Sequence, residues 1–419
     1  MQEFTGWQYL MIDCANQYGL DKELFEPRIQ WTMDNLANLE ALGQQRQIQG
    51  KWKEAPLYFK AVMAIRKAQQ GIPTGHKVGL DATCSGVQMM SVLTGCEAGA
   101  YHTGLIDPNK RTDAYTDCTQ LMNEDLAEKG LAVKVPRKDA KQALMTMYYG
   151  SKEEPKRVFG PDSPELEAFY RAGYKISPGS YDLLQILVDS WRPYALVHQW
   201  KLPDGFDARV KVMDKVEIRV EVDELFHSTF THEYKENIGK PYGLANAANV
   251  VHSVDGYVLR TMHRRCNYDR AMVKQAAKYL EIGMIERELG GQQAVASGKA
   301  GYYVEQYERS TVADVVILPY LDSLNVSQLT LAHMQKLMTI IQGMLQYQPF
   351  ELVTIHDEFM AHPNNLNWVR WQYKEILAEL AESNLLDDLL SQLYQTKGFF
   401  PKRSKDLASK IRKSNYGLS

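Results

Sequence analysis

The chain has 419 residues, of which 45% are hydrophobic and 24% charged, a composition ordinary for a soluble globular protein of two or three domains. No apolar run approaches the roughly 20 residues that cross a bilayer, and the N-terminus lacks a signal-peptide pattern, so we expect no membrane contact and a cytoplasmic location. Five scattered cysteines without a C-x-x-C pair argue against a disulfide framework or a zinc ribbon. The net charge of −3 argues against an extensive phosphate-binding surface, although residues 260–265 and 402–413 form two basic clusters.

The N-terminal part of the chain predicts a helix, a short strand and a second helix. Residues 56–70 carry apolar side chains at helical spacing and are followed by a stretch rich in Gly and Pro, which ends the helix. Residues 76–80 predict a short buried strand that runs into Asp81. Ser85 is expected to cap a helix that begins near Gln88.

The middle of the chain predicts one further helix and a β-hairpin. Residues 136–149 form the helix, because Pro136 is tolerated in a first turn and Gly150 is a typical C-terminal stop. Residues 210–222 alternate in polarity and are rich in valine, which predicts a hairpin that turns at residues 214–215.

The C-terminal part predicts a loop, a strand and a helical region, and it completes the evidence on fold class. Residues 290–301 are expected to form a flexible loop. Residues 352–355 predict a strand that ends at His356 and Asp357, and residues 366–394 carry apolar residues at helical spacing. Because strands and helices do not alternate regularly, we expect an α+β architecture. The absence of a G-x-G-x-x-G pattern and of a Walker loop argues against dinucleotide binding and P-loop hydrolysis.

The helix predicted over residues 136–149 carries a stripe of mixed chemistry. Four residues spaced by four positions fall along one side of this helix: Arg137, Lys141, Met145 and Tyr149. A core face would not tolerate the two cations, and a solvated face would not need the Met and Tyr. Two cations suit a polyphosphate and the aromatic end suits a base and sugar. The stripe therefore favours a clamp for a nucleoside triphosphate, with a solvated helix face as the alternative.

Two aspartates far apart in the sequence are candidates for metal binding. Asp81 and Asp357 each follow an apolar strand, which would hold the carboxylate rigidly. Two such carboxylates suit a pair of Mg²⁺ ions about 4 Å apart, the arrangement that stabilises the attacking and leaving oxygens in phosphoryl transfer. Taken singly, an aspartate after a strand is more often a cap or a turn residue.

Three segments together resemble motifs A, B and C of the single-subunit phage and mitochondrial RNA polymerases: residues 81–88 (DATCSGVQ), 137–150 (RKDAKQALMTMYYG) and 355–358 (IHDE). Further stretches that resemble this family are residues 7–30, 200–206 (WKLPDGF, ahead of the family's specificity hairpin), 251–256 (VHSVDG) and 411–419. The resemblance implies DNA-templated RNA synthesis on a right-hand polymerase fold of palm and fingers. Such a fold is mostly helical with a small antiparallel palm sheet.

The resemblance also implies a division of the chain into domains. We expect the first part of the palm, with motif A, at residues 1–110 and the fingers, with motif B and the specificity-hairpin region, at 111–252. The chain is then expected to return to the palm at 253–267 and to form an insertion atypical of the family at 268–345. The palm, with motif C, and the C-terminal foot are expected at 346–419. The insertion is either a surface for a partner or factor, or a helical decoration without a role.

Each residue that matches a motif acquires an implied role. Asp81 and Asp357, with the backbone carbonyl of Ala82, would hold Mg²⁺. Arg137 and Lys141 would grip the triphosphate, and Lys141 could protonate the leaving pyrophosphate as a general acid.

Four other positions are implied to form the nucleotide site: Met145, Tyr149, Gly150 and His252. Tyr149 would stack at the insertion site and help to sense the sugar, with His252 near the 2′-hydroxyl. His356 would lie beside the primer end. Tyr115 is a candidate for stacking on the template.

The resemblance favours RNA over DNA as the product. Family A DNA polymerases share motif B and the His-Asp-Glu of motif C, and Glu358 favours that alternative. They place a glutamate five positions after the motif A aspartate, where it blocks the 2′-hydroxyl, and this chain has Gly86 there. Met145 also replaces the phenylalanine that these DNA polymerases usually carry. A catalytically inactive scaffold with the polymerase fold is a further alternative, although both aspartates are intact.

The chain departs from the family by lacking the large N-terminal domain of full-length members. We therefore expect a split enzyme in which a second polypeptide supplies the missing half, with a shortened form of a longer polypeptide as the alternative. This layout is similar to the large subunit of the heterodimeric RNA polymerases of N-four-type bacteriophages, which act in the cytoplasm of the infected bacterium. The expected partners are a DNA template, nascent RNA and ribonucleoside triphosphates, with an accessory promoter or single-stranded-DNA-binding factor as a further candidate.

Overall fold

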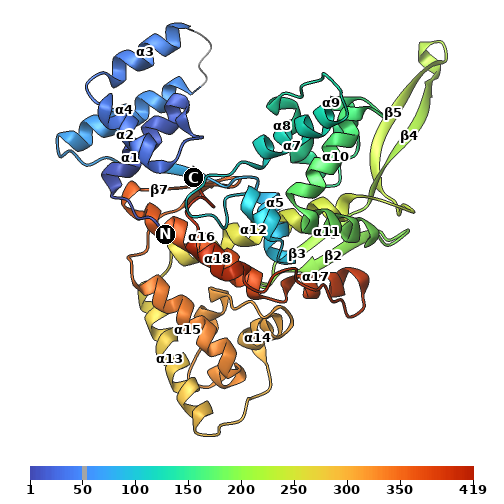
Figure 1. Ribbon diagram of the computed structural model, residues 1–419. Helices are drawn as coiled ribbons and strands as arrows, with labels where there is room; N and C mark the ends of the chain where they lie inside the picture. Colours follow the sequence, from blue (N-terminus) through green and yellow to red (C-terminus); the bar gives the residue numbers. More distant parts are fainter. Residues whose placement is uncertain (50–53) are drawn as a thin grey trace.

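The computed structural model describes residues 1–49 and 54–419 and is mostly helical, with small antiparallel sheets (Figure 1). The expected α+β class is confirmed at this level. The sheet at the centre has the order β1-β7-β6, formed by Val78–Asp81, Glu358–Ala361 and Val353–Ile355. The two predicted strands at residues 76–80 and 352–355 are therefore present, each displaced by one or two residues.

Helices from both ends of the chain surround this sheet. The N-terminal helices are α1 (Gly6–Ala15), α2 (Phe25–Asp34), α3 (Leu39–Gln49) and α4 (Ala55–Gln69), with a short π-helical turn at Asn16–Leu20. Helix α4 confirms the helix predicted over residues 56–70. Helix α5 (Ser85–Thr94) follows β1, and all ten of its residues are buried between α11 (Pro178–Asp189), α12 (Ala245–Cys266) and α16 (Leu366–Glu382). Helix α5 thus anchors the segment after Asp81 in the main hydrophobic core.

The start of α5 differs from the prediction. Ser85 does not cap a helix that begins near Gln88, because it is itself the first helical residue. The N-cap is Cys84, which has a left-handed backbone conformation and makes no side-chain cap hydrogen bond. The Ser85 hydroxyl instead donates a hydrogen bond to the Asp255 carboxylate on α12, at 3.4 Å.

A second group of helices follows α5 and packs together and against α11. It consists of α6 (Glu97–His102), α7 (Ala114–Glu128), α8 (Arg137–Met147), α9 (Glu153–Phe159) and α10 (Pro164–Ile176). Helix α8 confirms the helix predicted over residues 136–149, although Pro136 is its N-cap and regular helix ends at Met147. Gly150 has a φ of +90°, a backbone conformation open to glycine that ends the turn after α8.

The hairpin predicted at residues 210–222 is wrong. Strand β3 (Asp207–Lys211) pairs with β2 (Val197–Lys201), while β4 (Met213–Val222) is one continuous strand that pairs with β5 (Ser228–Asn237). The chain reverses after Asp223–Leu225, a 3₁₀ turn, rather than at residues 214–215. This turn contains no Gly or Asn, so the sequence carried no hairpin signal at the place where the strand ends.

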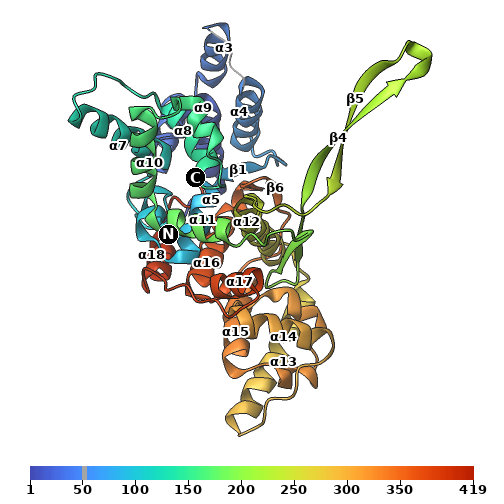
Figure 2. The same cartoon turned by 90° about the vertical axis from the view of Figure 1, so that its right-hand side faces the viewer.

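Residues 268–345 form a helical unit with its own hydrophobic core (Figures 1 and 2). Its elements are α13 (Arg270–Glu288), α14 (Gly298–Ser310), the 3₁₀ segments Val315–Tyr320 and Asn325–Gln328, and α15 (Leu331–Leu345). The loop predicted over residues 290–301 is irregular as far as Ser297. The prediction is wrong for its last four residues, which begin α14.

The C-terminal region returns the chain to the central sheet. The helical region predicted over residues 366–394 consists of α16 and α17 (Leu385–Tyr394), separated by a break at Ser383 and Asn384. A 3₁₀ turn at Pro363–Asn365 precedes α16, and helix α18 (Leu407–Lys413) follows α17. Beyond α18, Leu418 forms an antiparallel bridge with Ala82. Within the described part of the chain, no helix has both the length and the apolar character that a bilayer span requires.

Buried hydrogen bonds of Gln88 join three of these parts. The Gln88 amide donates to the carbonyls of Thr103 (2.9 Å) and Gly417 (3.1 Å), and its oxygen accepts from the Tyr373 hydroxyl of α16 (2.6 Å). Gln88 is fully buried, so none of these groups has water as a substitute.

Replacing Gln88 by Met should therefore destabilise the protein by roughly 2–3 kcal/mol, because it leaves buried polar groups unpaired. Urea unfolding would measure the loss, and amide hydrogen exchange should become faster over residues 414–419. Gln120→Met on the exposed face of α7 is the matched control. Equal stability of the two variants would contradict this account of how the C-terminal segment is held.

Candidate active site

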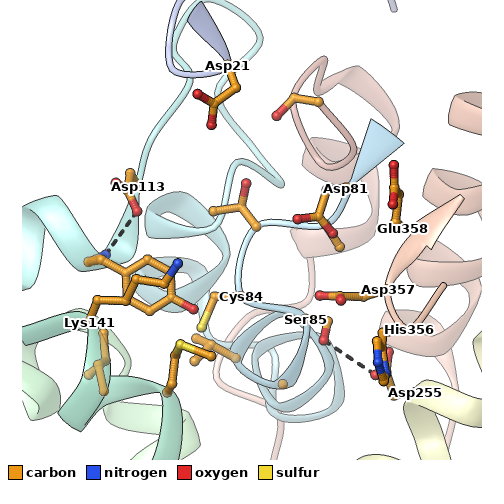
Figure 3. A pocket seen from close by; sticks show the side chains of 18 of the residues that line it. Asp21, Asp81, Cys84, Ser85, Asp113, Lys141, Asp255, His356, Asp357 and Glu358 are labelled. Carbon is orange, nitrogen blue, oxygen red and sulfur yellow. Dashed lines mark hydrogen bonds between the residues drawn. The ribbon is translucent and has the colours of Figure 1, made fainter. Parts of the chain in front are cut away.

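The central sheet brings the two predicted aspartates together. Asp81 is the last residue of β1, and Asp357 lies in the two-residue turn between β6 and β7. Because β1 pairs with β7 so that Asp81 is opposite Glu358, Asp357 lies next to Asp81, and Figure 3 shows both carboxylates directed into one pocket. The Ala82 N–H donates to the Asp357 carbonyl at 3.3 Å, which fixes the turn against the end of β1.

The carboxylates at this place repel one another. Burial, and then the charge of Asp357, raise the pKa of Asp81 from 3.8 to about 6. The same two causes raise the pKa of Asp255, on α12, to about 6, and burial is the main cause of the raised pKa of Glu358. A cation between Asp81 and Asp357 would relieve the repulsion of this pair, and carboxylate oxygens are the donors that hard divalent ions prefer. The donor set therefore fits a divalent metal.

Helix α8 faces the carboxylates with its cationic stripe. Arg137, Lys141, Met145 and Tyr149 all line the pocket, which has a volume of about 740 Å³. The Arg137 Nε donates to the Asp113 carboxylate at 3.0 Å and to the Thr116 hydroxyl at 2.9 Å, so part of its hydrogen-bonding capacity is used within the protein. Lys141 is exposed and directed into the pocket (Figure 3). Its ammonium is available to an anionic ligand.

Tyr149 lies between α8 and the start of α5, and its position depends on Gly86. Its ring stacks on His252 of α12, with centroids 4.6 Å apart and planes inclined by 8°. A Cβ atom at Gly86 would lie 2.5 Å from the Tyr149 hydroxyl, so any side chain there would displace the ring. The Tyr149 hydroxyl also lies against Ser85, which in turn contacts Asp255.

Tyr115 and His356 line the pocket, whereas Gly150 does not. The Tyr115 ring lies beside both cations of α8, with Lys141 Nζ 5.4 Å from its centroid, and its hydroxyl contacts the Cys84 thiol. His356 is exposed at the pocket edge. Gly150 is buried behind Tyr149 and ends the turn, so the structure does not place it with the other predicted nucleotide contacts.

Backbone strain occurs at two points on the pocket wall. His356 and Cys84 both have positive φ, 56° and 59°, although neither is glycine. Such conformations cost free energy and concentrate where surrounding structure fixes a functional geometry. The strained residues flank Asp357 and the start of α5, the two segments that set the carboxylate cluster.

The structure adds pocket residues to which the sequence assigned no role: Asp21, Lys22, Arg111, Asp113, Asp255 and Ser419. The Ser419 N–H donates to the Asp81 carbonyl at 3.0 Å, and Arg111 Nε donates to the Ser419 hydroxyl at 3.0 Å. A second hollow of about 1000 Å³ adjoins the pocket and shares Lys22, Arg111 and Arg137 with it. Asp255 could have been suspected, because it lies three residues after His252 and therefore on the same side of a helix. Arg111 and Asp113 gave no such signal.

Comparisons with known proteins agree with the motifs in the first part of the chain. Residues 2–156 match the family model of DNA-dependent RNA polymerase. The chain is 27% identical to the mitochondrial DNA-directed RNA polymerase of Neurospora crassa, over 35% of this chain and 12% of that protein. It is 29% identical to the DNA-directed RNA polymerase of Pseudomonas phage phiKMV, over 29% of this chain and 16% of the relative.

These matches support the phage- and mitochondrial-type RNA polymerase family that the motifs resemble. The alignments span less than one fifth of each of these relatives. The family model covers Asp81 and α8 but ends before His252, His356 and Asp357. The fold places these later residues in the same pocket as Asp81 and α8.

Replacing Asp81 by Asn should stabilise the metal-free protein near neutral pH. The native pKa of Asp81, about 6, lies above its ordinary value of 3.8, so the native state binds this proton more tightly and wild-type stability falls as the pH rises through that window. The extra stability of Asp81→Asn over the wild type should reach its full value above about pH 6 and be absent below about pH 4. Because the carboxylate opens into the pocket, we expect a rise of only roughly 2–4 °C in Tm.

Thermal unfolding in a metal chelator across this pH range measures the effect. Asp34→Asn, at the exposed end of α2 and outside the pocket, is the matched control for removal of one carboxylate charge. A loss of stability in Asp81→Asn near neutral pH would mean that neither burial nor the charge of Asp357 destabilises the ionised Asp81 carboxylate.

Proposed function

We propose that this protein catalyses DNA-templated RNA synthesis from ribonucleoside triphosphates. The observation that carries the proposal is the convergence of Asp81 and Asp357 in one pocket with Arg137 and Lys141 of α8 and with Tyr149, two residues beyond its end. The family match and the named relatives support it. In this proposal the palm comprises residues 1–110, 253–267 and 346–419, the fingers are residues 111–252, and the unit at 268–345 is an addition.

The residues act in defined ways within this proposal. Asp81 and Asp357, with the Ala82 carbonyl, would hold Mg²⁺, which when bound stabilises the attacking and leaving oxygens of the nucleotidyl transfer. Lys141, free to reach the pocket, binds the triphosphate and can give its proton to the departing pyrophosphate. Arg137 is oriented toward the phosphates by Asp113. The same hydrogen bond with Asp113 also explains how the Arg137 guanidinium keeps this position when no nucleotide is bound.

The sugar specificity of the site is proposed to come from Tyr149, Gly86 and His252. The glutamate that would exclude a 2′-hydroxyl has no room at position 86 while Tyr149 holds its present place. His252, exposed and stacked on Tyr149, can approach the sugar. This arrangement supports RNA rather than DNA as the product, and His356 and Tyr115 are proposed to contact the primer end and the template.

We further propose that a second polypeptide completes the enzyme, as in the split polymerases of N-four-type phages. The matched relatives extend far beyond the aligned segments, so parts of their machinery have no counterpart in the alignments. The phage relative fits a role in an infected host's cytoplasm.

Asp81→Asn and Asp357→Asn should each abolish primer extension, lowering the rate by at least about 10³-fold, because each removes one of the two metal-holding carboxylates. Extension of an RNA primer on a DNA template with Mg²⁺ measures the effect, with the chain alone and with the co-expressed second polypeptide. Near-normal extension by either variant would rule out the two-metal assignment. Glu351→Gln, a carboxylate outside the pocket, is the control.

Tyr149→Phe should weaken discrimination against deoxynucleotides, because it removes the hydroxyl that lies beside Ser85 and the sugar site. Loss of one hydrogen bond corresponds to roughly a tenfold change in the ratio of kcat/KM values for ribo- and deoxynucleotides. Tyr170→Phe, in α10 and outside the pocket lining, is the matched control. Equal selectivity in Tyr149→Phe and wild type would remove the sugar-sensing role.

A further inference from the structure

The second hollow, of about 1000 Å³, opens from the active-site pocket at one particular end. The junction between the two cavities is formed by the residues that line both: Lys22, Arg111, Asp113 and Arg137. Arg137 is the first residue of α8, whereas Tyr149 lies beyond the other end of this helix and lines the pocket but not the hollow. In Figure 3 the junction lies on the side of Asp113, away from His356. The hollow therefore joins the pocket where the triphosphate is proposed to lie, and not where the base and sugar would lie.

Cations outnumber carboxylates around the second hollow. Its charged lining consists of three carboxylates, Glu23, Asp113 and Asp117, and five cations, Lys22, Lys110, Arg111, Arg137 and Lys175, a net charge of +2 with His102 neutral. The whole chain has a net charge of −3, so the hollow departs locally from the acidic balance of the protein. A cavity lined mainly by one sign of charge concentrates ligands of the opposite sign.

Three of these cations are available to a ligand. Lys110 and Lys175 are exposed, and neither forms an ion pair within the part of the chain that the structure describes. Arg111 Nε donates to the Ser419 hydroxyl at 3.0 Å, while its two terminal nitrogens donate to no group among the described residues. Guanidinium and ammonium groups that face one cavity in this way form strong, charge-assisted hydrogen bonds with phosphate oxygens.

The loop between α6 and α7, which carries Lys110 and Arg111, is fixed by the C-terminal segment. Asn415 Nδ2 donates to the Pro108 carbonyl of this loop at 2.7 Å, in addition to the bond between Arg111 and Ser419. The same segment pairs with the end of β1. The cations of the loop are thus held in a defined position relative to the catalytic pocket, as a built binding site requires.

The mixture of charges favours a compact anion over a nucleic-acid strand. Glu23 and Asp117 line the same hollow, and Asp117 lies 2.6 Å from a ring nitrogen of His102. A strand carries a phosphate charge at every nucleotide and would meet these carboxylates along its length. A small polyphosphate avoids them, because it is short enough to lie among the cations at the junction.

We propose that the second hollow binds inorganic pyrophosphate, the product that leaves when a nucleotide is transferred, with Lys110, Arg111 and Lys175 as its ligands outside the catalytic pocket. The identity of the anion rests on the proposed function, whereas anion binding by the hollow does not require catalysis. The three cations lie outside the segments that resemble motifs A, B and C. They give the departing product a place to bind beyond Arg137, so that the triphosphate site is cleared for the next nucleotide.

Calorimetric titration of inorganic pyrophosphate into the full chain, in a metal chelator, tests the site. Lys110→Gln combined with Lys175→Gln should weaken pyrophosphate binding by roughly tenfold, because two attractions between ammonium and phosphate are lost. Lys134→Gln combined with Lys138→Gln removes the same charge from exposed positions outside both cavities and is the matched control. Absence of binding by the wild type, or equal weakening by the two pairs, would overturn the proposal.

Two further ligands identify the anion. A non-hydrolysable ribonucleoside triphosphate should bind in the catalytic pocket, so the changes at Lys110 and Lys175, which do not line that pocket, should alter its affinity by less than about twofold. A single-stranded DNA oligonucleotide should likewise bind the variant and the wild type equally. If either ligand loses as much affinity as pyrophosphate does, the hollow takes nucleotides or nucleic acid and the proposal is overturned.

The catalytic aspartates separate this inference from the proposed function. Asp81→Asn and Asp357→Asn should abolish primer extension and leave pyrophosphate binding in the chelator at least as tight as in the wild type, since neither residue lines the hollow. Normal extension by the wild type together with pyrophosphate binding that does not depend on Lys110 and Lys175 would overturn the inference alone. Pyrophosphate binding that depends on both lysines in a chain unable to extend a primer would overturn the proposed function and leave the anion site standing.

Discussion

The antiparallel pairing of β1 with β7 is the constraint on which the candidate active site depends. It sets Asp81 opposite Glu358 and thereby places Asp357, in the preceding turn, beside Asp81. A slip of this register by one residue would turn Asp81 to the other side of the sheet and separate the carboxylates. At the end of β1, the Ala82 N–H donates to the Asp357 carbonyl, and Ala82 also forms an antiparallel bridge with Leu418. These contacts extend the strand pairing beyond Asp81. A short sheet is thus made specific by hydrogen bonds from three distant parts of the chain.

Burial first, and then the charge of Asp357, raise the pKa values of Asp81 and Asp255, so the ionised carboxylates cost free energy in the absence of a cation. The positive φ of Cys84 and His356 adds backbone strain in the same place. Both are typical of a site organised before its ligand arrives, so that binding relieves repulsion that folding has imposed. The surrounding core, in which α5 is buried along its whole length, contributes the stability that offsets this cost in folding free energy.

The sequence predicted the parts of the site that depend on local spacing. The stripe from Arg137 to Tyr149 needs only helical periodicity, and the strands before Asp81 and Asp357 need only short apolar runs. It could not predict that Arg137 is bound by Asp113, or that Arg111 reaches Ser419, because such contacts arise from packing between elements. The error at residues 214–215 has a similar origin. The valine alternation was read correctly as strand, but the turn at Phe226 and His227 has none of the residues that usually mark one.

Electron paramagnetic resonance of bound Mn²⁺ tests the central claim most directly. Titrated into the protein with a non-hydrolysable ribonucleoside triphosphate, Mn²⁺ should occupy two sites per chain whose spins are coupled, because Asp81 and Asp357 face the same small volume. Asp357→Asn should remove the coupling. Two uncoupled ions, or coupling that survives in Asp357→Asn, would contradict the account.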